Sequence, residues 1–400
     1  MKKKILFIMG CLDNGGGERS LINLLKLFDY EKFEVDLILF KERGLFLGQI
    51  PEQVNLRSDC DILHLMYSDS LKNSIGFKKL YYTFIHLFGT VYSKICTRSG
   101  FQKGQYRWKK FYKKVIPDFN IKYDIAISYL EGETLYYLVD KVKSEQKIAW
   151  IHTDYSKIKA DLEYDLSYFK EVDKIVTISN ECKNVLTKLF PEVLDKIVTL
   201  PNLTNSRAIT SLANTYYPKE FEFEGFKFVS VGRLVYLKGF DMAIQATAVL
   251  KSRGLKFKWF ILGDGELRKN LKLMAKKYNV DEFIEFIGSK ENPYVYMKNA
   301  DIIIQTSRYE GKSMVLDEAK ILRRPIIVTN YDTVGDQIRE EEGLIVEMNY
   351  TAIADGIEKM LKNKERYINF LKENEYGNQE EISQYYDLLD SYEMRGINDE

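Results

Sequence analysis

Short apolar runs alternate with amphipathic segments along almost the whole chain. Runs that are apolar at consecutive positions predict buried strands, whereas apolar residues at every third or fourth position predict helices. In one such segment, Leu267, Leu271, Met274 and Ala275 fall on a single helical face. The predicted strands occupy residues 5–9, 35–40, 124–128, 147–151, 174–178, 196–200, 227–232, 258–263, 301–306 and 325–329.

This alternation of strands and helices predicts an α/β protein with parallel sheets that helices cover on both faces. A chain of 400 residues is too long for one ordinary core, so we expect two domains. A polar, turn-rich stretch at 204–225 separates two sets of strands. We therefore predict a first Rossmann-like domain at 1–203 and a second at 204–377. A helix at about 378–400 is expected to pack back on the first domain.

Composition narrows the functional class. Hydrophobic residues make up 45% of the chain and charged residues 29%, as in ordinary soluble proteins. The formal net charge of +1 gives no overall field for nucleic acid, so no nucleic-acid partner is expected. Four scattered cysteines and three histidines argue against a zinc site. The apolar run at 5–12 leads into a glycine-rich turn, which favours a first strand over a signal peptide, and we expect a cytoplasmic protein.

Basic residues follow the first strand of the second predicted sheet. Arg233 comes directly after that strand, and Lys238 precedes the next helix. A strand end with Arg and Lys before a helix start suits an anion such as a diphosphate. Solvated loop charges are the alternative. Gly263 and Gly265 mark another strand-to-helix turn, which a plain tight turn explains as well as a ligand does.

Two glutamates bracket the start of a later helix. Glu310 follows the apolar strand at 301–306, and Glu318 lies in the second turn of the helix. Ser313 is a suitable N-cap, so the backbone amides at Ser313 and Met314 are expected to form a positive helix end. Carboxylates accept hydrogen bonds from paired hydroxyl groups. The pattern fits a phosphate-and-sugar site, and also a capped helix with a solvated face.

The first domain carries two further candidates. Gly15, Gly16 and Gly17 follow the first strand and open a helix, without the spacing of a dinucleotide fingerprint. They still permit close approach of the backbone to a ligand. His152 lies just past the strand at 147–151, where it is either a structural histidine or a ligand contact.

Taken together, these residues resemble the retaining glycosyltransferases of family four, which have the GT-B fold. The resemblance covers nearly the whole chain, and its most specific part is the pair Glu310 and Glu318, with seven residues between them. It implies two Rossmann-like domains facing a cleft and a nucleotide-diphosphate sugar as co-substrate, with a UDP-sugar favoured. It implies no metal and no other cofactor.

The resemblance also implies roles in the second domain. Arg233 and Lys238 would hold the donor diphosphate, together with the chain at Ser313 and Met314. Glu318 would bind the ribose hydroxyls.

The remaining motif residues would surround the transferred sugar. Glu310 would contact it as one of two catalytic residues. His152, the other, would be a hydrogen-bond partner rather than a nucleophile. Gly15, Gly16 and Gly17 would line the cleft. Lys312 and Arg324 depart from the family pattern, and Lys312 could contact phosphate or an acidic donor sugar.

Between Ser70 and Ile116 the chain has eleven basic residues and no Asp or Glu, with aromatic residues interleaved. Such a mix is typical of an anionic membrane surface, although a solvated helical face is the plainer alternative. With the resemblance, we expect peripheral membrane contact at the inner face of the plasma membrane and a lipid-linked acceptor such as an undecaprenyl-diphosphate sugar. The predicted membrane patch consists of Lys109, Lys110, Lys113 and Lys114.

The sequence therefore predicts a metal-independent, retaining hexosyltransferase-type enzyme of surface-polysaccharide or capsule assembly. Two alternatives stay open. One is a non-catalytic, glycosyltransferase-like partner subunit. The other is a sugar-nucleotide epimerase on the same fold.

Overall fold

The computed structural model describes residues 2–13, 15–67, 77–97 and 99–390, with residues 77–79 described by their backbone alone. The chain divides into two compact units. The first comprises residues 2–13, 17–202 and 381–390, and the second comprises residues 15–16 and 203–380. Part of the predicted C-terminal helix, residues 391–400, lies outside the described residues.

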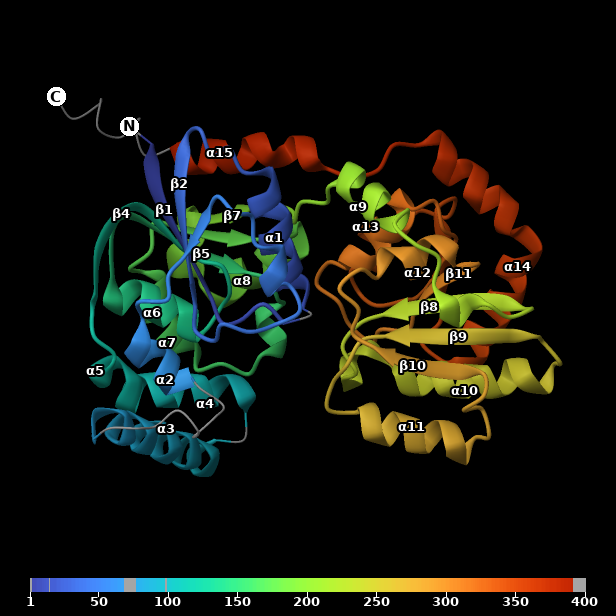
Figure 1. The fold of residues 1–400 in the computed structure, drawn as a ribbon, viewed down its shortest axis with the longest axis horizontal. Helices are drawn as coiled ribbons and strands as arrows, with labels where there is room; N and C mark the ends of the chain where they lie inside the picture. Colours follow the sequence, from blue (N-terminus) through green and yellow to red (C-terminus); the bar gives the residue numbers. More distant parts are fainter. Residues whose placement is uncertain (1, 14, 68–76, 98, 391–400) are drawn as a thin grey trace. The chain divides into compact units, whose positions relative to one another are not determined.

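The first unit is built on a seven-stranded sheet in which every neighbouring pair is parallel. The order is β3-β2-β1-β4-β5-β6-β7 (Figure 1). In β1, residues Ile5 to Met9 are fully buried, which explains the continuous apolar run in the sequence. The strands are β1 (Lys3–Met9), β2 (Phe33–Leu39), β3 (Val54–Leu56), β4 (Phe119–Ser128), β5 (Val142–Ile151), β6 (Lys174–Thr177) and β7 (Ile197–Thr199).

Helices cover both faces of this sheet. On one face lie α1 (Gly16–Leu27) and α15 (Ile382–Asp390). Tyr385 of α15 stacks on Trp150 with ring centroids 5.3 Å apart, and its hydroxyl donates to the Pro201 carbonyl at 2.6 Å. The other face packs against a second group of elements: α2 (Asp61–Tyr67), η3 (Trp108–Tyr112), α6 (Glu133–Lys141), α7 (Leu162–Phe169) and α8 (Asn180–Leu189).

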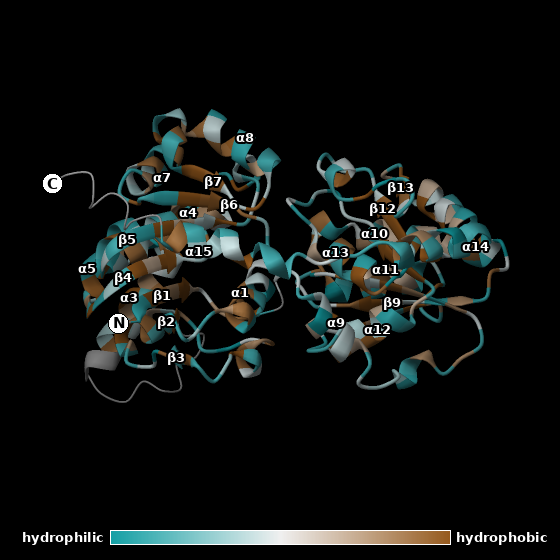
Figure 2. Ribbon diagram, turned by 90° about the horizontal axis from the view of Figure 1, so that it is seen from above, coloured by the Kyte–Doolittle hydropathy of each residue, from teal (hydrophilic) through white to brown (hydrophobic). Residues whose placement is uncertain are grey.

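The second unit repeats this design with a six-stranded parallel sheet in the order β10-β9-β8-β11-β12-β13. Figure 2 shows the hydrophobic strand β9 among helices with polar outer faces. The strands are β8 (Phe226–Val231), β9 (Phe257–Leu262), β10 (Ile284–Gly288), β11 (Ile302–Gln305), β12 (Ile326–Thr329) and β13 (Gly343–Val346). One face packs on α10 (Phe240–Ser252), α11 (Arg268–Lys277) and α14 (Tyr350–Glu373), and the other on α9 (Ser206–Ala213), α12 (Tyr294–Asn299) and α13 (Met314–Ile321).

The prediction of two doubly wound parallel sheets is confirmed. In the first sheet the strand order reverses between β1 and β4, and in the second between β8 and β11. At such a switch point the connections leave toward opposite faces and open a crevice at the carboxyl ends of the strands. The predicted strands did not include β3, β10 and β13. All three lie at sheet edges, where one neighbour is missing and the apolar run is correspondingly short.

Candidate active site

The centre of the candidate site is an ion pair at the switch point of the second sheet. Lys238 ends a 3-10 turn, η7 (Tyr236–Lys238), after β8, and Glu310 follows β11. The Lys238 Nζ lies 2.5 Å from the Glu310 Oε1. Only 21% of the lysine side chain and 12% of the glutamate side chain are exposed. The fold thus brings together two residues 72 positions apart, both predicted as site residues.

Glu310 is held by more than the lysine. Its Oε1 also accepts hydrogen bonds from the Gln305 Nε2 at 2.7 Å and the Ser307 Oγ at 2.6 Å. No described residue donates to the second oxygen, Oε2, which leaves that oxygen for a ligand. Gln305 and Ser307 were not predicted from the sequence; the one signal for Gln305 is an amide at the end of an otherwise apolar strand.

Gln305 extends this network to the start of α13. Its Oε1 accepts from the Ser313 Oγ at 2.7 Å. The Ser313 N–H donates to the Gln337 Oε1 at 2.9 Å. The prediction that Ser313 is an N-cap is therefore correct for its position but wrong for its bonding, because its side chain makes no cap hydrogen bond. Its amide is also not free for a phosphate in this structure, because Gln337 already accepts from it.

Glycines allow the loops of the site to pack closely. Gly239 has a φ of +64°, and an added Cβ would lie 2.0 Å from the Thr306 carbonyl oxygen. A Cβ on Gly263 would lie 1.9 Å from the Gly232 carbonyl oxygen, and one on Gly265 would lie 2.6 Å from that of Leu234. Close packing against the backbone of the loop that carries Lys238 therefore accounts for Gly263 and Gly265 without a ligand.

Arg308, another residue that was not predicted, fixes the same loop from the other side. Its guanidinium binds the Asp241 carboxylate through two hydrogen bonds of 2.8 and 2.6 Å and lies 4.2 Å from the centre of the Tyr236 ring. The Arg308 N–H donates to the Leu237 carbonyl at 2.7 Å. Bidentate pairing and backbone bonding together hold Lys238 in place.

Arg233 and Met314 lie apart from this network. The Arg233 side chain is exposed, and no residue of the described chain pairs with its guanidinium. Met314 is the first residue of α13 and is buried. Lys312 lies 3.7 Å from an Asp317 carboxylate oxygen.

Glu318 is fully buried, and its Oε1 accepts a hydrogen bond from the Tyr294 hydroxyl at 3.2 Å. The sequence placed it in the second turn of a helix, as the structure does. The structure adds that this carboxylate has no exposed surface. For Glu318 to contact a ribose, the residues that cover its carboxylate must therefore move.

The first unit has its own polar cluster beyond β5. The His152 N–H donates to the Glu131 Oε2 at 3.1 Å, and the Thr153 Oγ1 donates to the Glu131 Oε1 at 2.9 Å. Both ring nitrogens of His152 are buried, and neither has a hydrogen-bond partner among the described residues. Burial of the ring lowers the pKa of His152 to about 3. The imidazole is therefore neutral at physiological pH and cannot serve as a charged acid.

Of the three predicted loop glycines, Gly17 lies against this histidine. An added Cβ on Gly17 would lie 3.0 Å from the Leu130 Cδ2 and 3.6 Å from the His152 Cγ. Gly16 opens α1, and an added Cβ there would meet nothing within 4 Å. Gly15 directly precedes α1. Close packing therefore explains Gly17 but not Gly16.

The four lysines of the predicted membrane patch are exposed but differ in their surroundings. Lys109 and Lys110 lie in η3, and Lys113 and Lys114 lie in α5 (Lys113–Val115). The Lys113 Nζ pairs with an Asp140 oxygen at 2.8 Å, and the Lys109 Nζ lies 5.0 Å from the centre of the Tyr164 ring. The neighbouring aromatic residues Trp108 and Tyr112 are fully buried, so this stretch presents charge without an apolar face.

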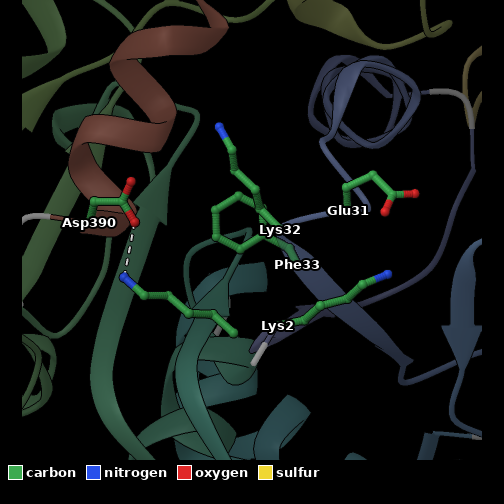
Figure 3. A pocket seen from close by; sticks show the side chains of 6 residues that line it. Lys2, Glu31, Lys32, Phe33 and Asp390 are labelled. Atoms are coloured by element: carbon green, nitrogen blue, oxygen red, sulfur yellow. Dashed lines mark hydrogen bonds and ion pairs between the residues drawn. The ribbon is translucent and has the colours of Figure 1, made fainter.

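A hollow on the first unit lies at the amino ends of β1 and β2 (Figure 3). Three of its charged groups are already bonded: the Lys3 Nζ lies 2.9 Å from an Asp390 oxygen, and the Lys2 Nζ donates to the Tyr30 carbonyl. Because ligands of such folds bind at the carboxyl ends of the strands, this hollow is not a candidate active site.

Neither a metal site nor a membrane span is found within the part of the chain that the structure describes. There, no three His, Cys, Asp or Glu side chains are placed to hold a metal ion. No helix among the described residues has both the length and the apolar composition needed to cross a membrane.

Comparison with known proteins relates the chain to glycosyltransferases. Residues 218–376, which include the Lys238–Glu310 network, match the family model for glycosyl transferases group 1. The prediction of a glycosyltransferase enzyme is confirmed. An amylovoran biosynthesis glycosyltransferase of Erwinia amylovora is 30% identical over 175 residues, or 44% of this chain and 48% of that protein. The aligned part thus spans about half the length of that relative.

Two other similarities extend over the whole chain. The Campylobacter jejuni N-acetylgalactosamine-N,N'-diacetylbacillosaminyl-diphospho-undecaprenol 4-alpha-N-acetylgalactosaminyltransferase is 28% identical over 369 residues, which is 91% of each chain. An Anabaena protein, HepE, solved in complex with UDP, has a TM-score of 0.65 at 14% identity and covers 98% of this chain and 100% of that one. The fold is GT-B, as predicted.

Proposed function

We propose that the protein is a metal-independent, retaining glycosyltransferase of surface-polysaccharide assembly. It moves a sugar from a nucleotide-diphosphate donor to a glycan or lipid-linked acceptor. The observation that carries this proposal is the Lys238–Glu310 pair at the switch point of the second sheet, 2.5 Å apart and mostly buried. A fixed cation and a carboxylate with one free oxygen suit a donor with a diphosphate and sugar hydroxyls.

Each group has a role in this proposal. Lys238 binds the diphosphate and stabilises the negative charge that develops on it as the sugar leaves. Arg233, which is exposed and pairs with no residue of the described chain, folds over the same phosphates. Glu310 accepts a sugar hydroxyl through Oε2. Neutral His152 contributes a hydrogen bond to the transferred sugar, and Glu318 binds the ribose after its surroundings open.

The transfer proceeds with retention and without a covalent enzyme intermediate. The bond between the anomeric carbon and the phosphate oxygen breaks, and the acceptor oxygen bonds to that carbon on the same face. The acceptor proton passes to the departing phosphate oxygen. Three hydrogen bonds to the Glu310 Oε1 stabilise the carboxylate and make it a poor nucleophile.

The donor is a UDP-sugar and the acceptor is undecaprenyl-diphosphate-linked. The Anabaena neighbour binds UDP, and the name of the Campylobacter relative includes a diphospho-undecaprenol. A lipid-linked acceptor places the enzyme at the inner face of the plasma membrane. The exposed lysines of the predicted patch favour an anionic surface, at about 1 kcal/mol for each lysine near it.

The test is a thermal-shift series with UDP, GDP, ADP and CMP in the presence of a chelator. A ligand that binds the folded state alone raises the melting temperature. We expect UDP to raise it, and Lys238→Ala and Arg233→Ala to reduce the shift. The control is Lys258→Ala, which removes another lysine 2.5 Å from a carboxylate, that of Glu285.

Other outcomes would favour the alternatives. If no nucleotide shifts the melting temperature at millimolar concentration, the protein is a non-catalytic partner subunit. If the protein interconverts UDP-sugars without an acceptor, it is an epimerase.

A further inference from the structure

The side of helix α3 (Phe77–Cys96) that faces the first unit combines small and polar residues with the partly buried Tyr82 and Ile85. Gly89 and Ser93 are buried, and an added Cβ on Gly89 would lie 3.2 Å from the Phe111 Cδ2. The His86 Nδ1 and the Tyr112 hydroxyl are hydrogen-bonded at 2.7 Å. The side of α3 that packs on the first unit is therefore not its most hydrophobic side.

The opposite side of α3 carries large apolar side chains in the open. In Figure 1, α3 lies on the outside of the first unit, beyond α2 and α4 (Gly100–Arg107). Six side chains recur at spacings of three and four residues and form one stripe. Their exposed fractions range from 45% to 78%. The members of this α3 stripe are Leu80, Phe84, Leu87, Phe88, Val91 and Ile95.

A helix in a soluble protein normally buries its apolar stripe and exposes polar residues. A contiguous exposed apolar patch of this kind marks an interaction surface. In α3 the usual arrangement is reversed, so the α3 stripe is available for an apolar partner.

Charge decides which partner fits. The sequence from Ser70 to Ile116 has no acidic residue. The exposed residues Lys94, Lys110 and Lys114 have no ion-pair partner in the described chain. Two copies of this surface would bring like charges together, whereas anionic lipid headgroups would complement them.

We propose that the α3 stripe inserts into the interfacial layer of an anionic membrane, with α3 parallel to the bilayer plane. This inference assigns the proposed membrane contact to a particular surface. It rests on the proposed function only in that the acceptor is linked to a membrane lipid. The apolar side chains reach below the headgroups, and the unpaired lysines stay among them. A helix of 20 residues is about 30 Å long, so the stripe spans several lipids.

The test is vesicle flotation of the full chain without donor or acceptor. The vesicles contain phosphatidylcholine, with or without phosphatidylglycerol. The variant Phe84→Glu/Val91→Glu places charges in the stripe at side chains that are 65% and 56% exposed. We expect binding to phosphatidylglycerol vesicles to fall by more than about tenfold, because two large apolar groups can no longer leave water.

The matched control is Leu194→Glu/Leu273→Glu, which adds the same charge at residues that are 55% and 57% exposed but lie outside α3. We expect it to bind vesicles like the wild type. An equal loss in the control would mean that net charge, and not the stripe, drives binding. Unchanged binding of the α3 variant would also overturn the proposal, as would equal wild-type binding to pure phosphatidylcholine.

Self-association is the competing outcome. If the wild type does not float but sediments as a dimer that Phe84→Glu/Val91→Glu dissociates, a second copy covers the stripe and the proposal is wrong. The UDP thermal shift of the α3 variant separates the two hypotheses. The variant retains that shift if the proposed donor site is correct, whatever the vesicles show.

Discussion

The two polar clusters at the carboxyl ends of the sheets differ in how fully their hydrogen bonds are satisfied. In the second unit, Glu310 accepts from three donors and Lys238 is already paired. In the first unit, both ring nitrogens of His152 are buried, without a partner in the part of the chain that the structure describes. An unsatisfied buried polar group destabilises the fold. The cluster of the second unit is preorganised on its own, whereas the cluster of the first unit keeps bonding capacity for a ligand.

The largest expected effect is on the preorganised cluster. Replacing Lys238 by Ala removes the fixed cation that faces the developing phosphate charge. We expect the transfer rate to fall by about a hundredfold to a thousandfold. The measurement is steady-state transfer from UDP-sugar, with Lys258→Ala as the control. A higher KM with an unchanged kcat would show that Lys238 binds the donor without stabilising the transition state.

His152 offers the contrasting change. Because its ring is neutral, its substitution removes a hydrogen bond and no charge. We expect His152→Ala to lower the transfer rate by about tenfold to a hundredfold and to leave the UDP thermal shift unchanged. His152→Asn, which keeps a donor and an acceptor, should recover part of the rate. If His152→Ala abolishes UDP binding, the histidine acts on the nucleotide and not on the sugar.

The unpartnered histidine also makes stability depend on pH. The His152 pKa is about 3 in the folded protein and about 6.5 in an unfolded chain. Between these values the unfolded state binds a proton that the folded state does not. The neutral imidazole of His152 therefore makes its full contribution to stability above about pH 6.5. As the pH falls from there toward about 3, the free energy of unfolding decreases by at most about 1.4 kcal/mol per pH unit.

Denaturant unfolding at several pH values checks this effect. The difference between the wild type and His152→Asn isolates it from other titrating groups, such as Asp165, whose pKa burial raises to about 6. A difference that stays constant with pH would show that the imidazole charges freely in the folded protein.

The smallest expected effect concerns Ser313. Ser313→Ala removes its hydrogen bond to Gln305 and should lower the free energy of unfolding by about 1 kcal/mol. Ser179 is a useful comparison, because its Oγ accepts from the Cys182 N–H as a true N-cap of α8, and its loss also costs about 1 kcal/mol. Only Ser313→Ala should alter the UDP thermal shift. Equal shifts in both variants would place Ser313 outside the donor site.

The class of fold and the candidate residues could be predicted from the sequence alone. Apolar runs such as Ile5 to Met9 are buried on both faces of a parallel sheet, so their pattern could be read without coordinates. The motif residues Lys238 and Glu310 were also identifiable, because each lies in the segment that follows the carboxyl end of a predicted strand.

The tertiary structure alone decided the contacts. The pairing of Lys238 with Glu310, the fixing of their loop by Arg308 and the burial of Glu318 depend on residues far apart in the chain, which periodicity cannot relate. The same holds for α3. There, the packing of Gly89 and Ser93 against the first unit decides that the apolar side faces outward.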